Sequence, residues 1–254
     1  MLTAQRREEI RKILWERKSV TAQEMVSLFQ VSGQTIRRDF DALEKEGFLC
    51  RHYGGVMLKE PKTMLVPNRY KQEMFVDAKH AIALQAAPAI VPNDCIFLDD
   101  STTTLMLCDE LTDIPLTVVT NSHSVITRLG DRPSIKLIST GGIYDRQSDG
   151  YFGVETEKYL RQHCFDKAFI SSTSVDLVRG VSDSDESRAS VHSAVVSNTD
   201  KIYLLADHTK LGKTGFVTVC ALADVDCLIT DRPVDDIWRT SLRENDVCLL
   251  DTTD

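Results

Sequence analysis

Apolar residues in the first sixty positions recur at the three- and four-residue spacing of amphipathic helices. Residues 4–17 predict one such helix. Residues 21–24 read Thr-Ala-Gln-Glu, a capping box in which the side chain of each end residue accepts from the other's backbone amide. A second helix is therefore expected to begin near Ala22. Its apolar residues, which we expect to be buried, are Met25, Leu28 and Phe29.

A turn at residues 30–33 separates this helix from a third one, for which Ser32 is a suitable N-cap. Gly47 ends the third helix, and residues 48–51 and 56–58 predict a small β-hairpin around a Gly-Gly turn. Two short helices joined by a tight turn and followed by a hairpin are typical of a winged helix-turn-helix. The second helix of that motif enters the major groove of duplex DNA.

The polar face of the third helix and the hairpin carry the residues expected to touch DNA. Gln34 is placed to read a base edge, and Arg37 or Arg38 to read guanine or hold a phosphate. Taken alone, an arginine pair is more often a solvated helix face, but its place between a cap and a basic hairpin favours DNA contact. Asp39 is acidic and is expected to orient a neighbouring arginine. The predicted DNA-binding residues are Thr21, Ser32, Gln34, Thr35, Arg37, Arg38, Lys45, Arg51, His52 and Gly54.

The remainder of the chain alternates short apolar runs with segments of helix length. The runs are residues 95–98, 116–120, 135–138, 167–170, 202–206 and 227–229. Such a pattern predicts a parallel sheet covered by helices on both faces. The expected fold class is α/β, with an N-terminal winged helix-turn-helix over residues 1–58. A linker over 59–72, which contains two prolines, leads to an effector-binding and oligomerisation domain over 73–254.

Polar residues or glycines follow these strands at their carboxyl ends, which is the edge where open α/β sheets bind ligands. Residues 99–104 read Asp-Asp-Ser-Thr-Thr-Thr and lead into a helix, so their hydroxyls and amides suit a phosphate or another anion. The alternative is plain capping of that helix. His208 is expected to make a structural hydrogen bond rather than to act as a base. The predicted effector-binding residues are Asp99, Ser101, Thr102, Thr103, Thr104, Thr120, Asn121, Gly141, Gly142, Asp183, Asp185, Asp207 and Lys210.

Charge is divided unevenly between the two parts. The net charge is −8, yet residues 1–60 hold 11 Lys and Arg against 9 Asp and Glu, whereas residues 61–254 hold 19 against 29. A weakly positive head on an acidic body suits a protein whose head alone touches phosphates. An architectural DNA binder is disfavoured, because such binding rests on widespread positive charge.

The remaining composition narrows the protein class. Seven cysteines are scattered without a C-x-x-C pair, so we expect reduced, packed thiols and neither a metal nor a cofactor. No nucleophile-elbow, zincin or P-loop motif occurs, and an enzyme is not expected. The N-terminus becomes charged at once and lacks the apolar core of a secretory signal. We therefore expect a cytoplasmic protein with no membrane partner.

Residues 31–40, 43–47 and 51–55 closely resemble, without gaps, the signature of the DeoR family of bacterial transcription regulators. Phe40 stands where the family usually has leucine. The resemblance extends through the second part. Its matching motifs are Asp99 with Thr102-Thr103, Thr120-Asn121, Gly141-Gly142, residues 207–210 and Thr230-Asp231. It implies an effector domain similar in fold to ribose-5-phosphate isomerase, with phosphorylated sugars or related catabolic intermediates as inducers.

Two departures from the family pattern bear on the effector. Ser101 replaces a glycine and Asp100 a small residue, and a carboxylate at position 100 would repel a phosphate unless it points away. Residues 181–186 are more acidic than the family pattern, and Arg188 and His192 stand near its basic position. A free sugar, a sugar acid or an unusual sugar phosphate therefore stays open as effector.

The sequence thus predicts a repressor of a sugar or polyol catabolic operon. A sugar phosphate or related metabolite would release it from double-stranded operator DNA, which it binds as a homo-oligomer, a dimer or tetramer. The alternative is an enzyme similar to sugar-phosphate isomerases with a DNA-binding appendix. In that case Asp183, Asp185 or Glu186 would supply the base.

Overall fold

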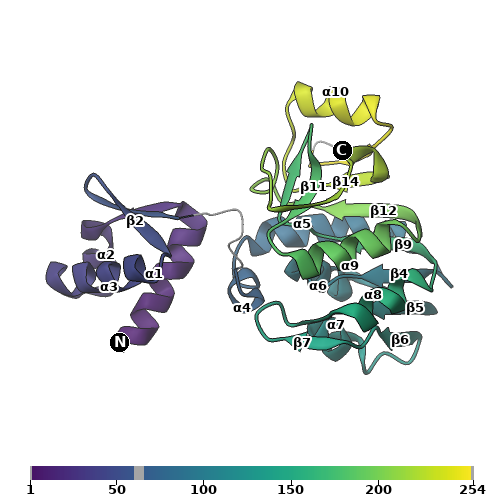
Figure 1. Cartoon of the computed structure of the whole chain (residues 1–254), viewed down its shortest axis with the longest axis horizontal. Coiled ribbons are helices and arrows are strands. Elements are labelled where there is room, and N and C mark those ends of the chain that lie inside the picture. The colour runs from purple at the N-terminus through teal and green to yellow at the C-terminus, as the bar shows by residue number, and fades with distance from the viewer. Residues whose placement is uncertain (1, 60–65, 253–254) are drawn as a thin grey trace. The chain divides into compact units, whose positions relative to one another are not determined.

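The computed structural model describes residues 2–59 and 66–252 and divides into two compact units, which are treated separately (Figure 1). Among these residues, the first unit comprises 2–59 and 73–75, and the second comprises 66–72 and 76–252. Within the described ranges, no helix is long and apolar enough to cross a membrane. The same ranges hold no cluster of His, Cys, Asp and Glu suited to a metal ion.

The first unit has the expected winged helix-turn-helix. Its elements are α1 (Thr3–Arg17), β1 (Ser19–Thr21), α2 (Ala22–Phe29), α3 (Gly33–Lys45), β2 (Leu49–His52) and β3 (Gly55–Leu58), with sheet order β1-β3-β2. Both predicted caps are confirmed. Thr21 and Glu24 form the capping box of α2, and Ser32 Oγ accepts from the amide of Thr35 at 3.2 Å to begin α3.

Two details of this unit differ from expectation. Leu28 is 57% exposed, because the inward stripe of the short α2 runs through Met25 and Phe29, four residues apart. The strand β1 was not predicted, and it pairs Val20 with Val56 of β3. Gly55 is required for this pairing, since a Cβ there would stand 2.2 Å from the carbonyl oxygen of Val20.

The second unit is a doubly wound α/β domain. Its strands β15-β14-β12-β9-β4-β5-β6 form one sheet in which every pair is parallel. The bounds are β4 (Cys95–Leu98), β5 (Leu116–Thr120), β6 (Ile135–Ser139), β9 (Phe165–Ile170), β12 (Thr199–Leu205), β14 (Cys227–Ile229) and β15 (Cys248–Leu250). The six predicted strands are confirmed, and β15 is an addition at the edge.

Helices cover both faces of this sheet, as Figure 1 shows. The helices are α4 (Asn68–Lys71), α5 (Val76–Ala86), α6 (Thr102–Glu110), α7 (His123–Leu129), α8 (Val154–Arg161), α9 (Glu186–Val196) and α10 (Asp236–Glu244), with 3-10 turns at Ala87–Ala89 and Leu222–Asp224. Side chains of α5, α6 and α7 pack on one face, and those of α8, α9 and α10 on the other. Strand β4 serves both cores, because Phe97 points to one face and Ile96 and Leu98 to the other.

Two smaller sheets flank the main one. The hairpin β7 (Ile143–Asp145) and β8 (Gly150–Phe152) is antiparallel, and so is the three-stranded sheet of β10 (Ser174–Asp176), β11 (Gly180–Asp183) and β13 (Val217–Cys220). From β4 the chain proceeds to β5 and β6 on one side, whereas β9 begins the other side. The direction of winding therefore changes between β4 and β9, and we refer to the region outside their carboxyl ends, where open α/β sheets bind ligands, as the crevice.

Part of the expected linker over residues 59–72 belongs to the second unit. Residues 60–65 lie outside the described ranges. Residues 68–71 form α4. Its Asn68 is buried within the second unit, and the backbone amide of Asn68 donates to Gln147 O at 2.8 Å. The buried Asn68 and its hydrogen bonds attach this segment to the second unit. The polar, proline-containing sequence gave no sign of this attachment.

Candidate functional site

The helix α3 presents its polar face to solvent. Gln34, Arg37, Arg38 and Lys45 are exposed, while Thr35 is half-buried and helps to cap the helix. Within residues 2–59, neither Arg37 nor Arg38 makes an ion pair. Their guanidinium groups are therefore available to an outside partner.

Asp39 has a structural place in this unit. Its side chain is 1% exposed and accepts from Arg6 Nε at 2.6 Å and from Arg7 Nε at 3.0 Å. It does orient arginines, as expected, but they come from α1 rather than from its own helix. The contact ties α3 to α1 and so fixes the angle at which α3 is presented.

The hairpin of the wing has an aromatic tip. His52 and Gly54 are exposed, and Tyr53 between them is 101% exposed, a feature that sequence reasoning passed over. Arg51 is already paired with two carboxylates of α3, those of Asp41 and Glu44. Its charge is therefore partly balanced within the unit, unlike those of Arg37 and Arg38.

Asp99 stands at the change in winding of the main sheet, directly after β4. It is fully buried and accepts from the Ser101 amide at 2.9 Å and from the Ser171 amide, just past β9, at 2.6 Å. The two central strand ends are thus joined through one carboxylate. Polar residues that follow β4 and β9 in the sequence therefore lie together at the strand ends.

His192 of α9 lies between two buried carboxylates. Its Nε2 is 3.1 Å from Asp99 Oδ2 and its Nδ1 is 2.8 Å from Asp183 Oδ2. Burial opposes the charge of His192, but the two carboxylates outweigh it and raise its pKa to about 10. The ring is therefore a cation that donates from both nitrogens. Burial also opposes the charges of Asp99 and Asp183, yet their pKa values lie below the ordinary value because His192 bonds to both.

Both carboxylate oxygens of Asp183 accept hydrogen bonds from neighbouring residues. Besides His192, it accepts from the amide and hydroxyl of Thr173 at 2.9 and 2.7 Å. Asp99 and Asp183 thereby form the floor of the crevice, together with His192, and lock α9 to the ends of β4 and β11.

A buried ion pair between Asp100 and Arg188 lies beside this floor. Burial and the charge of Asp99 raise the pKa of Asp100, while Arg188 works in the other direction. The added carboxylate noted in the sequence therefore faces an arginine. That arginine comes from α9, near the basic position that the family pattern led us to expect.

Three lysines approach the same place. Lys210 donates to Ser171 Oγ at 2.7 Å and lies 3.8 Å from Asp207. Burial, with repulsion from Arg188 and Lys210, lowers the pKa of Lys71 to about 7. Burial and the charge of Lys210 lower the pKa of Lys79 to about 8. Burial is the main cause of both lowered pKa values and the neighbouring cations add to it, so a bound anion would favour the charged forms of these lysines.

The hydroxyls before α6 are largely used for capping. Ser101 Oγ accepts from the Thr104 amide at 3.1 Å and lies 2.7 Å from the Thr104 hydroxyl. Thr102 and Thr103 are buried beside them without a role in this cap. Thr120 donates to Leu98 O at 2.6 Å. These residues shape the strand ends.

Gly142, His208 and Asp207 make contacts that support the local structure. Gly142 (φ +121°) lies where a Cβ would stand 2.1 Å from Thr156 Oγ1, and Thr156 donates to Gly141 O at 2.7 Å. His208 Nδ1 is 2.8 Å from Asp231 Oδ2, which is the structural bond that was expected. Asp207 accepts from the Thr209 amide at 3.0 Å.

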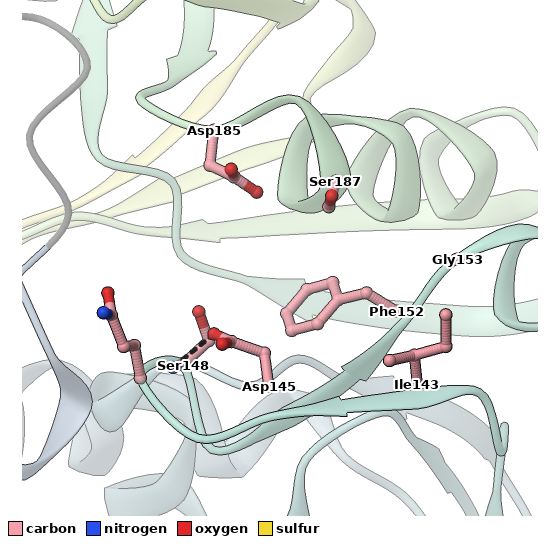
Figure 2. A pocket seen from close by; sticks show the side chains of 8 residues that line it. Ile143, Asp145, Ser148, Phe152, Gly153, Asp185 and Ser187 are labelled. Atoms are coloured by element: carbon pink, nitrogen blue, oxygen red, sulfur yellow. Dashed lines mark hydrogen bonds between the residues drawn. The ribbon is translucent and has the colours of Figure 1, made fainter.

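A pocket of about 310 Å³ opens between the β7–β8 hairpin and the start of α9. Figure 2 shows Asp185, just before α9, and Ser187, in its first turn, across the opening from Asp145 and Ser148. Its other lining residues are Ile143, Gln147, Phe152 and Gly153. Only Asp185 among the lining residues was predicted. The pocket adjoins the ion pair, because Arg188 follows one turn after Asp185 and Gly150 packs against Asp100.

Sequence reasoning missed Asn68, Lys71, Lys79 and Asp145. The first two lie in a segment that reads as a linker, and Lys79 in a helix with no marked polar face. Asp145 belongs to a three-residue strand. No local sequence pattern pointed to any of them.

Comparison with known proteins covers both units. The model described as "DeoR-like helix-turn-helix domain" matches residues 6–62, and "DeoR C terminal sensor domain" matches residues 74–232. The uncharacterized HTH-type transcriptional regulator YulB of Bacillus subtilis (strain 168) is 36% identical over 235 residues, covering 92% of this chain and 91% of the relative.

Two further relatives carry the name of an operon. The putative aga operon transcriptional repressor of Escherichia coli O157:H7 is 29% identical, over 91% of this chain and 87% of its own. The L-fucose operon activator of Haemophilus influenzae is 28% identical, over 88% and 90%.

Among solved structures, a ribose 5-phosphate isomerase A from Methanocaldococcus jannaschii is 16% identical, covers 52% of this chain and 53% of its own, and has a TM-score of 0.37. A likeness this distant carries no functional information. The two family models span both units, and YulB matches nearly the whole length. The chain therefore belongs to the DeoR family of DNA-binding transcriptional regulators.

Proposed function

We propose that this regulator is a cytoplasmic repressor of a sugar or polyol catabolic operon, and that a phosphorylated sugar or polyol releases it from operator DNA. The observation that carries the proposal is the group of cations at the sheet crevice, where Lys71, Arg188 and Lys210 converge. The names of the aga and L-fucose operon regulators support a sugar-linked role. We propose repression rather than activation because the aga relative is named a repressor.

The proposed DNA-binding unit is residues 2–58. In it Gln34, Arg37 and Arg38 enter the major groove, because α3 presents them to solvent at its N-terminal part. Lys45, Arg51, His52 and Gly54 hold the phosphate backbone beside the groove. Thr21, Ser32 and Thr35 act near the helix starts, where capping fixes them.

The effector-binding and oligomerisation unit is proposed to be residues 66–252. One winged helix contacts one half-site, so useful specificity requires a dimer or tetramer. In this unit the cations take the anionic group of the effector. Asp145 and Asp185 in the adjoining pocket accept hydrogen bonds from hydroxyl groups. A molecule with both groups is a sugar or polyol phosphate.

The other predicted effector residues have supporting roles in this proposal. Asp99 and Asp183 form the floor with His192, and Asp207 positions Lys210. Ser101, Thr104 and Thr120 shape the strand ends, and Gly141-Gly142 allow the close approach of Thr156. Thr102, Thr103 and Asn121 are buried after β4 and β5, beside the other strand-end residues.

We do not propose isomerase activity. Aldose–ketose proton transfer needs a carboxylate that can take up a proton near neutral pH. Asp183 is fully buried, its oxygens are occupied, and its pKa is lowered by His192. Asp185 caps α9 and Glu186 faces solvent. Incubation with pentose phosphates should yield no ketose, and measurable turnover would overturn this part of the proposal.

A ligand panel tests the effector class directly. The full chain is screened by thermal shift against matched pairs of sugars or polyols with and without phosphate. A ligand at about 100 times its Kd adds roughly 2.7 kcal/mol of stability, which is easily measured. We expect hits among phosphorylated compounds and none among their neutral partners. Hits confined to neutral sugars would contradict the proposed anion site.

A further inference from the structure

The helix α4 is held in the effector unit by one buried residue. Asn68 donates its side-chain amide to Asp100 O at 2.6 Å and to Ser148 O, which adjoins the pocket. Lys79 donates to the backbone carbonyl of Lys71 at the other end of the helix. The segment is therefore fastened to both parts of the proposed effector site, the ion pair and the pocket wall.

Three buried polar atoms at this junction have no hydrogen-bond partner among the described residues. They are Asn68 Oδ1, Asp100 Oδ1 and Arg188 Nε. An unsatisfied buried polar atom costs about 1–3 kcal/mol, so native proteins rarely keep several together without a reason. Two of these atoms accept hydrogen bonds and one donates. A phosphoryl oxygen next to a hydroxyl group would satisfy both kinds.

The charge at the end of α4 fits the same ligand. Lys71 lies in the field of Arg188 and Lys210, which repel its cationic form, and of Asp100 and Asp183, which favour it. An arriving anion would tip this balance towards the charged lysine. Asn68 and Lys71 are the first and last residues of α4, and residues three apart in a helix are neighbours on its surface.

We propose that α4 is a strap that binds the effector, with Lys71 bonding to its anionic group and Asn68 to a neighbouring hydroxyl. Occupancy then holds residues 66–72 more firmly on the effector unit than their own hydrogen bonds do. This inference rests on the proposed function, because it assumes an anionic effector. It adds a route by which the ligand acts on the DNA-binding unit.

That route follows from the order of the chain. In sequence, α4 is preceded by the DNA-binding unit and followed by residues 73–75, which cluster with that unit as well. A strap that is fixed on the effector unit changes the freedom with which the paired winged helices of an oligomer reach two half-sites. The effector need not touch the winged helix to control it.

The test uses the full chain with inorganic phosphate as the probe and hydrogen exchange followed by mass spectrometry as the readout. The reporters are the amides of α4, such as Gln72, which donates to Asn68 O at 2.8 Å, and Asn68 itself. The variant is Lys71→Met. The matched control is Arg69→Met, which removes the same charge from the same helix at an exposed position.

We expect phosphate to slow exchange over residues 66–72 in the original chain and in Arg69→Met. In Lys71→Met, phosphate should bind about tenfold more weakly, as expected for a lost charge-assisted bond, and α4 should stay unprotected. Binding of phosphate with unchanged α4 exchange in the original chain would overturn the strap alone. Unaltered affinity in Lys71→Met would also overturn it. Absence of phosphate binding to the original chain would overturn the anionic effector as well as the strap.

Discussion

Asp100 and Arg188, 88 residues apart in sequence, form a buried ion pair beside Asp99 at the end of β4. The carboxylate replaces a small residue of the family pattern and would repel a phosphate if it stood alone. Paired with Arg188, it acts as a built-in counter-ion. An anionic effector therefore competes with Asp100 for part of the arginine's charge.

Replacement of this counter-ion should tighten anion binding at the expense of stability. Asp100→Asn removes the ion-pair partner of the buried Arg188, and breaking a buried pair costs about 3 kcal/mol in the free protein. Phosphate should then restore more stability to the variant than to the original chain, as measured by urea unfolding with and without phosphate. Equal stabilisation of both proteins would show that Arg188 does not meet the anion.

The pH dependence of stability should expose two opposing groups. The pKa of His192 is about 10 in the folded chain against 6.5 unfolded, so its contribution is complete below pH 6.5 and is lost as pH rises through about 10. The pKa of Lys71 is about 7 against 10.5, so its charging destabilises the fold as pH falls from 10.5 to 7. The two slopes oppose each other between pH 7 and 10.

Replacing His192 or Lys71 should reveal the pH dependence of stability that the other residue contributes. Lys71→Met should lose stability with rising pH more steeply than the original chain, by up to about 1.4 kcal/mol per pH unit. His192→Gln should change the slope in the opposite direction. Urea unfolding at several pH values between 7 and 10 measures both. Identical slopes for all three proteins would contradict the assigned protonation states.

Anion binding itself should take up a proton above neutral pH. Lys71 is about half charged at pH 7, and a bound anion favours its charged form. Calorimetric titration with phosphate at pH 8 in buffers of different ionisation enthalpy should therefore report proton uptake. In Lys71→Met the uptake should fall, while Arg69→Met should match the original chain. Equal uptake in all three would place the titrating group elsewhere.

The DNA-binding residues can be tested apart from the effector site. Arg37→Ala or Arg38→Ala should abolish specific binding to an operator selected from random duplexes, with the fold intact by circular dichroism. If residual binding is measurable, its salt slope should fall by roughly one for a lost phosphate contact. Arg17→Ala, an exposed arginine at the end of α1, serves as control. Unchanged affinity and slope in the α3 variants would remove them from the interface.

The sequence predicted those parts of the fold whose causes are local. The capping box of α2, the N-cap of α3 and the doubly buried strands each leave a pattern within a few residues. Leu28 was assigned wrongly because an eight-residue helix shows too few turns to fix its inward stripe. The strand β15 is three residues long at an edge, and nothing in its composition separates it from a loop.

The site was predictable where it follows strands and not where distant segments meet. Asp99 and Lys210 were expected because they stand after apolar runs. Asn68 reaches Asp100 across 32 residues from a segment with the composition of a linker, and Arg188 reaches it across 88. Such pairings depend on how the sheet is wound, and a single sequence carries no local record of them.

The measurement that tests the central claim most directly is the affinity for a selected operator as a function of effector concentration. Fluorescence anisotropy with the phosphorylated hit of the ligand panel would be recorded for the original chain, Arg69→Met and Lys71→Met. The account predicts that effector weakens operator binding at least tenfold in the first two proteins and much less in Lys71→Met. Unchanged operator affinity of the original chain at saturating effector would contradict it.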